Sequence, residues 1–160
     1  MKKKNLKGFT LIELIVVIAI IGVLAAILVP AMMGWVRKAS VNSANSNAKS
    51  IFTNAQTIAQ EFETKGSLIN GSLGRAKTTI TGGNASFVSD VDATMSGSAA
   101  HKDAWTVLVN NGVVEAAIYS ANGTTYTGGY PTGADPTKSA LAWSTANVGS
   151  AKAGSSAYMN

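Results

Sequence analysis

The sequence predicts an α+β protein in which one long N-terminal helix, with a hydrophobic half followed by an amphipathic half, carries a small antiparallel β-sheet as a globular head. Residues 9–29 are apolar except for Thr10 and Glu13. Residues 37–65 place apolar side chains at helical spacing, and residues 66–160 are rich in small polar residues with short strand-like segments. These three observations define the hydrophobic half, the amphipathic half and the head.

The composition indicates a chain that associates with a membrane or with copies of itself. Hydrophobic residues make up 46% of the 160 residues and charged residues 13%, about half of the roughly 25% that is usual in soluble domains. The net charge of +5 arises mainly from four lysines among the first seven residues, so there is little reason to expect a nucleic-acid partner. Because it has no cysteine, the chain cannot form a disulfide, a thiol nucleophile or a cysteine metal site.

The apolar stretch predicts a single membrane-spanning helix over residues 9–36. As a helix, its first 21 residues are long enough to cross a hydrocarbon core of roughly 30 Å. The lysines before it outnumber Arg37 and Lys38 after it, which places Met1 in the cytoplasm and the residues beyond about 37 outside. Pro30 and Gly34 weaken the helix where it leaves the membrane. We expect a kink at Pro30, because proline lacks an N–H and clashes with the preceding turn.

Three interpretations of this segment follow from its residues. A secretory signal peptide would need a cleavage site, which Val29-Pro30-Ala31 supplies loosely, but the apolar stretch is longer than usual for such a signal. A plain signal anchor would leave Glu13 as a carboxylate at the membrane interface. The third interpretation gives Glu13 a partner and comes from a resemblance to a known family.

Residues 7–14, KGFTLIEL, with Pro30 seventeen residues after Glu13, resemble the class III signal of type IV prepilins and pseudopilins. The resemblance covers about residues 1–40 and implies a pilin-like fold. It implies that a prepilin peptidase cleaves between Gly8 and Phe9, that the new amine of Phe9 is methylated, and that Glu13 acts in assembly. In filaments of the family, the segment that corresponds to residues 22–30 can lose helical hydrogen bonds and stretch.

The chain then divides into four parts. These are a leader peptide (1–8), a transmembrane or filament-core helix (9–36), an amphipathic helix of the head (37–65) and a globular head with a C-terminal loop region (66–160).

The residue types of the motif suit this processing physically. Gly8 lets the backbone enter a narrow protease site without a side chain in the way. Cleavage creates an ammonium group at Phe9, and Glu13 lies four residues further along the same helix face, within reach of the N-terminus of its own chain or of a neighbouring copy. Because an unpaired carboxylate is costly in lipid or between packed subunits, a stagger that brings Glu13 close to the Phe9 amine of a neighbouring copy is favoured. This pairing would set an axial register for assembly.

The stretch after Arg37 predicts the helix on which the head packs. Lys65 and Gly66 predict its end, as a basic last turn followed by a C-cap glycine. A helix over residues 9–64 would be roughly 84 Å long, so lipid or other subunits must cover its first half and the head its second. The predicted apolar face of the second half consists of Ala44, Ala48, Ile51, Phe52, Ala55, Ile58, Ala59 and Phe62.

The head contains several short candidate elements. Residues 113–119 predict an apolar strand, and Asn122-Gly123 predicts a hairpin turn into residues 124–127. Residues 78–81 and 86–88 are further strand candidates. For residues 105–109 we favour a short helix capped by Asp103 over a strand that ends in a hairpin turn. A long loop is predicted for residues 128–136.

The head offers no constellation for catalysis, so we expect a protein that is not an enzyme and binds no cofactor or metal. His101 is the only histidine and fits an exposed loop residue, and no hydrolase or phosphate-loop motif is present. Asp90 and Asp92 could approach a cation, but their incomplete ligand set favours a solvated loop. Five aromatic residues could form a carbohydrate or adhesin surface, although core packing is the commoner role; they are Trp105, Tyr119, Tyr126, Tyr130 and Trp143.

These observations favour a structural subunit of a type IV pilus that supports adhesion or twitching motility. The expected partners are copies of the chain in a helical filament, the prepilin peptidase, the membrane and the pilus assembly platform. We expect a single-pass membrane protein with a cytoplasmic N-terminus before assembly and an extracellular pilus afterwards.

Two alternatives remain open at this point. A pseudopilin of a type II secretion or DNA-uptake system shares the motif, although here Asp135-Pro136 is followed by Thr137-Lys138 and not by the Trp-Gly of the major secretion pseudopilin. The other alternative is an unrelated single-span anchored surface protein. The absence of cysteine also departs from the pilins of diderm bacteria, which usually close their C-terminal loop with a disulfide.

Overall fold

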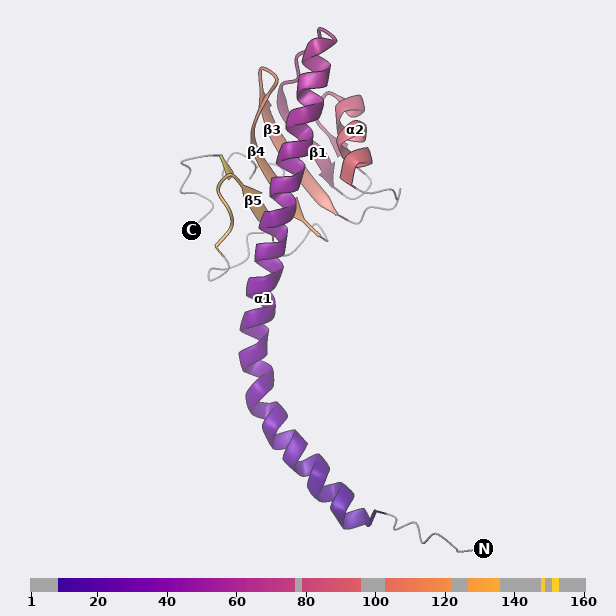
Figure 1. Ribbon diagram of the computed structural model, residues 1–160, viewed down its shortest axis with the longest axis vertical. Helices are drawn as coiled ribbons and strands as arrows, with labels where there is room; N and C mark the ends of the chain where they lie inside the picture. The colour runs from indigo at the N-terminus through magenta and orange to yellow at the C-terminus, as the bar shows by residue number, and fades with distance from the viewer. Residues whose placement is uncertain are drawn as a thin grey trace, which may run out of the picture. The chain divides into compact units, whose positions relative to one another are not determined.

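A computed structural model describes residues 9–76, 79–95, 103–121, 127–135, 148 and 151–152. The chain forms two compact units, Met1–Val36 and Arg37–Asn160. The elements are α1 (Leu11–Thr64), β1 (Gly71–Ala76), β2 (Thr79–Thr81), α2 (Ala85–Met95), β3 (Ala104–Asn110), β4 (Val113–Ser120) and β5 (Gly128–Tyr130). This is the predicted α+β class, with a pilin-like arrangement of one long helix and an antiparallel sheet (Figure 1).

The first unit consists of the first half of α1. The helix begins at Leu11 and continues through Pro30 and Gly34 without a break. Its side chains are exposed within the unit, and by length and composition this is the one helix among the described residues that could cross a membrane. The expected kink at Pro30 stays a prediction. The segment is helical, as its unbroken run of apolar residues indicated.

The second half of α1 buries the predicted apolar face against the head. The buried residues of this half are Val41, Ala44, Ala48, Ile51, Ala55, Ile58 and Ala59, and Phe52 and Phe62 pack beside them half-buried. The helix ends at Thr64, as predicted. Gly66 adopts φ of 77°, and the N–H of Ser67 donates to the carbonyl of Phe62 over 2.9 Å. This 6→1 bond and the left-handed glycine form a Schellman cap.

The head is a five-stranded antiparallel sheet in the order β2-β1-β3-β4-β5. Figure 1 shows the second half of α1 lying across the strands, with α2 beside it. The core between helices and sheet centres on Trp105 and Phe87, which are fully buried. On the other face, Ile118 and Ala116 pack with Val148 and Ala151 in a smaller cluster.

Two predicted elements of the head are wrong. Residues 105–109 form strand β3 and not a helix capped by Asp103, because Asn111-Gly112 turns the chain directly into β4 with φ of 49° and 77°. Two consecutive residues with positive φ match the twist of paired strands. Residues 86–88 lie in helix α2 and not in a strand, because the side-chain oxygen of Asn84 accepts the N–H of Phe87 over 3.0 Å and caps the helix.

Other predictions for the head are confirmed or fall outside the described residues. Strands β4 and β2 occupy the segments predicted at 113–119 and 78–81. Strand β1 was not predicted, and β5 lies in the segment expected to be a loop. The leader (1–8), His101, the Asn122-Gly123 turn and most of the C-terminal region lie outside the described residues.

Candidate functional site

The helix start beside the predicted cleavage point is built by Thr10 and Glu13. The N–H and the hydroxyl of Thr10 donate to Oε2 of Glu13 over 2.8 and 2.7 Å, and the N–H of Glu13 lies 3.3 Å from the Thr10 hydroxyl oxygen. This reciprocal pairing is a capping box, in which each side chain satisfies a backbone N–H that has no partner in the first helical turn. The Thr-x-x-Glu spacing is visible in the sequence, although the sequence-based interpretations gave Glu13 either the Phe9 amine as a partner or a place at the membrane interface, and not a capping role.

The capping box uses only one of the two carboxylate oxygens of Glu13. Both bonds from Thr10 end on Oε2, and Oε1 accepts no hydrogen bond from the part of the chain that the structure describes. Phe9, four residues away, is 90% exposed. The site therefore holds the carboxylate in a fixed orientation at the helix start, and within the described residues Oε1 accepts no hydrogen bond.

The apolar side chains that follow have no cover within their own unit. Every large apolar side chain of α1 from Leu11 to Val36 is exposed. At Gly22 and Gly34, an added Cβ would meet nothing within 4 Å, so packing inside the described chain does not require a glycine at either position. A continuous apolar surface of this extent needs lipid or further protein as its environment.

The head is fixed to the second half of α1 by a polar latch at Asn45. Its Nδ2 donates to the carbonyl of Ala134 over 2.9 Å, and its Oδ1 accepts the N–H groups of Gly129 and Ala134 over 3.0 and 2.9 Å. Gly128 allows the close approach, because a Cβ there would lie 2.1 Å from the carbonyl carbon of Ala44. This latch joins α1 to the segment at and after β5 without a covalent cross-link.

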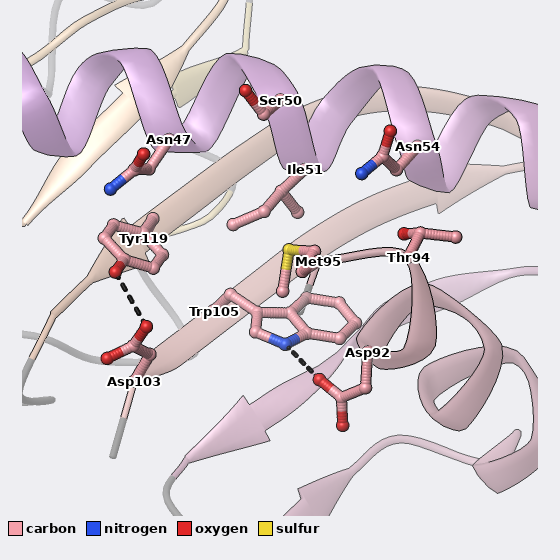
Figure 2. Close-up of a pocket in the computed structure, with 10 residues that line it drawn as sticks. All are labelled: Asn47, Ser50, Ile51, Asn54, Asp92, Thr94, Met95, Asp103, Trp105 and Tyr119. Carbon is pink, nitrogen blue, oxygen red and sulfur yellow. Dashed lines mark hydrogen bonds between the residues drawn. The ribbon is translucent and has the colours of Figure 1, made fainter. Parts of the chain in front are cut away.

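A second polar cluster lies where α2 meets the sheet (Figure 2). Asp92 is buried and pairs with Arg75, and its Oδ1 accepts the indole N–H of Trp105 over 2.8 Å. The expectation that Asp92 lies in a solvated loop is therefore wrong. The described residues contain no group of three or more His, Asp or Glu side chains that could hold a metal ion.

Tyr119 and Asp103 form the other pair of this cluster. The Tyr119 hydroxyl donates to Oδ2 of Asp103 over 2.8 Å. Burial of the phenol, together with the adjacent Asp103 carboxylate, raises the pKa of Tyr119 to about 12. Trp105 and Tyr119 are core residues at 1% and 8% exposure, and Tyr130 is half-buried; Tyr126 and Trp143 lie outside the described residues.

A helix with an exposed apolar first half, a capped start and an antiparallel head on its second half defines a pilin-like α+β fold. Comparison with known proteins supports this class. Residues 3–29 match the family described as "Prokaryotic N-terminal methylation motif". The chain thus carries the class III signal, and the curated proteins similar to it include type IV pilins and fimbrial proteins.

Three relatives illustrate the similarity. A fimbrial protein of Moraxella nonliquefaciens is 50% identical over 54 residues, which are 34% of this chain and 35% of the relative. The type IV major pilin protein PilA of Myxococcus xanthus is 40% identical over 55 residues (34% and 25%), and a type IV major fimbrial protein FimA of Dichelobacter nodosus is 36% identical over 95 residues (54% and 59%). The matches thus span between a quarter and three fifths of these relatives. No solved structure matches significantly.

Proposed function

We propose that this chain is a structural subunit of a type IV pilus and acts by assembling, not by catalysis. The observation that carries the proposal is the N-terminal methylation motif over residues 3–29, in front of a helix whose apolar first half is fully exposed. The similarity to fimbrial proteins and to a type IV major pilin protein supports a filament subunit over an unrelated single-span surface protein.

In this proposal the chain passes through three states. It is inserted as a prepilin with its lysine-rich leader in the cytoplasm and residues 9–36 across the membrane. A prepilin peptidase cleaves between Gly8 and Phe9, and the Phe9 amine is methylated. The assembly platform then transfers the subunit into a helical surface filament for adhesion or motility, in which neighbouring copies replace lipid around the apolar half of α1.

Glu13 gives the assembly its register in this proposal. The capping box orients the carboxylate, because Oε2 is held by Thr10, and Oε1 is left for the methylated ammonium of Phe9 on a neighbouring copy. A charge pair in a water-poor interface contributes mainly specificity, since any other stagger leaves both charges unpaired. The apolar contacts would supply the attraction, and the charge pair would select one axial position.

The test is the chemical identity of the subunit in sheared surface filaments. Intact mass and N-terminal sequencing should find a chain of 152 residues that starts at N-methylated Phe9, since eight of the 160 residues are removed. Gly8→Val should block processing and leave the full-length chain in the membrane. Cleavage after Ala31 would instead show a secreted protein and overturn the proposal. Deletion of the gene should remove the filaments; unchanged filaments with failed secretion or DNA uptake would favour a pseudopilin.

A further inference from the structure

The face of the sheet away from α1 is covered in part by residues near the C-terminus. Val148 is 2% exposed and Ala151 is fully buried. Both pack in one cluster with Ala116 and Ile118 of β4. We call Val148, Ala151 and Lys152 the C-terminal clasp. None of them belongs to the helix start on which the filament proposal rests.

Thr132 anchors the clasp through its main chain and its side chain. Its N–H donates to the carbonyl of Ala151 over 3.0 Å, and its hydroxyl donates to the carbonyl of Lys152 over 3.0 Å. Thr132 follows β5 in the segment that Asn45 ties to α1 through Ala134. The two bonds therefore fix the clasp to a part of the head that α1 itself holds in place.

A surface ion pair completes the clasp. Nζ of Lys152 lies 2.9 Å from Oε1 of Glu115 on β4. The hydrogen bond from Lys152 lowers the pKa of the Glu115 carboxyl. The Lys152 side chain is 51% exposed, and ion pairs this exposed contribute little to stability. The pair therefore orients the lysine more than it holds the clasp closed.

The clasp is held much more weakly than the core on the other face of the sheet. Its apolar part consists of one valine and one alanine, whereas the core beneath α1 contains Trp105, Phe87 and Leu73. Because the chain has no cysteine, no disulfide secures the clasp. Regions with few buried apolar contacts open at a lower free energy than the whole fold. The clasp should therefore open while the core stays folded.

We propose that the C-terminal clasp is a reversible closure of the head, which opens without unfolding the core and exposes the apolar outer face of β4. Opening breaks the two bonds from Thr132 and uncovers Ile118 and Ala116. A disulfide would make such a closure permanent in an oxidising environment, whereas hydrogen bonds leave it in equilibrium. The opening takes place within one subunit, so it does not depend on the filament role.

Tryptic cleavage after Lys152 reports the open clasp. Trypsin must bind the lysine side chain and the carbonyl of the bond that it cuts. In the closed clasp the Lys152 ammonium is paired with Glu115, and the Lys152 carbonyl accepts the Thr132 hydroxyl. At low protease concentration, the cleavage rate therefore follows the population of the open clasp. Cleavage after Arg75, which lies in β1 and pairs with Asp92, requires the core to open.

The experiment digests the purified full chain in detergent micelles and measures both cleavages by mass spectrometry. Each rate is divided by the rate for a short peptide of the same local sequence, and the corrected rate after Lys152 should exceed the one after Arg75. Thr132→Val should accelerate cleavage after Lys152 about fivefold, because it removes one hydrogen bond and keeps the side-chain shape. Thr53→Val is the matched control and should change neither rate, because the exposed Thr53 hydroxyl donates to the Lys49 carbonyl within α1.

A core variant shows whether the opening is local. Val88 of α2 is fully buried in the core beneath α1 and lies outside the cluster of the clasp. Val88→Ala should accelerate cleavage after Arg75 about tenfold, because it leaves a cavity in the core, and should leave cleavage after Lys152 unchanged. If Val88→Ala accelerates both cleavages equally, the clasp opens only with the whole head and the proposal is wrong. Equal rates after Lys152 in Thr132→Val and Thr53→Val would also overturn it, because Thr132 would then not hold the clasp.

Discussion

The latch at Asn45 should contribute more to the stability of the head than any other polar side chain on the buried side of α1. Asn45→Ala removes three hydrogen bonds of 2.9 to 3.0 Å and leaves the N–H groups of Gly129 and Ala134 and the carbonyl of Ala134 without their partner. At about 1 kcal/mol for each bond, the loss is about 3 kcal/mol of unfolding free energy. The higher helix propensity of alanine offsets about 0.5 kcal/mol of this loss, because alanine is a better helix former than asparagine.

Urea unfolding of the full chain in detergent, followed by circular dichroism of the head, measures this loss. Asn42→Ala is the control, because it makes the same substitution on the same helix at an exposed position whose side chain forms no hydrogen bond within the described residues. The propensity gain is the same in both variants, so it cancels when their unfolding free energies are compared. Asn45→Ala should be about 3 kcal/mol less stable than Asn42→Ala. A difference below about 0.5 kcal/mol would refute the latch, because that is the usual effect of a surface substitution.

Two further predictions concern a titration and the helix start. Because the pKa of Tyr119 is raised to about 12, native Tyr119 stays protonated while the unfolded chain ionises above pH 10. The protonated phenol therefore stabilises the fold fully below pH 10, and this stabilisation is lost by about pH 12. The unfolding free energy of the native sequence should fall by about 2 kcal/mol over this range, and that of Tyr119→Phe should not show this fall when both are unfolded at each pH. Equal slopes for both proteins would contradict the assigned burial. Glu13→Ala should leave processing and membrane insertion intact but reduce the yield of sheared filaments. Glu13→Gln removes the charge and keeps a side-chain oxygen for the cap, so it tests the two roles separately. A normal filament yield from Glu13→Ala would show that the carboxylate is a simple interfacial residue.

Local sequence signals predicted the parts of the fold that depend on neighbouring residues. The apolar face of α1 repeats every three or four residues, and the Lys65-Gly66 end carries its own capping chemistry, so both were predictable. Strand β4 was predictable from its run of apolar and β-branched residues. Strands β1 and β5 were missed because each is rich in glycine, and their pairing partners lie in β3 and β4.

The polar contacts of the head were beyond prediction for a related reason. Asn45 bonds to residues 84 and 89 positions away, and Asp92 joins Arg75 and Trp105 from two different strands. No spacing in the sequence indicates such pairs, because the fold itself brings them together. Residues 86–88 were predicted as a strand, since a short apolar run has no periodicity that distinguishes it from a helix. In the folded chain, the Asn84 side chain caps these residues as the start of helix α2.

The capping box changes the meaning of the Glu13 substitutions. Alanine removes the charge and also the acceptor that holds the Thr10 N–H and hydroxyl, so a loss of filaments from Glu13→Ala alone cannot be assigned to the charge pair. Glutamine keeps a side-chain oxygen at the position where capping boxes accept either Glu or Gln, but it carries no charge. If register depends on the ammonium of Phe9, Glu13→Gln should lose filaments as Glu13→Ala does. If the helix start is what matters, Glu13→Gln should assemble normally.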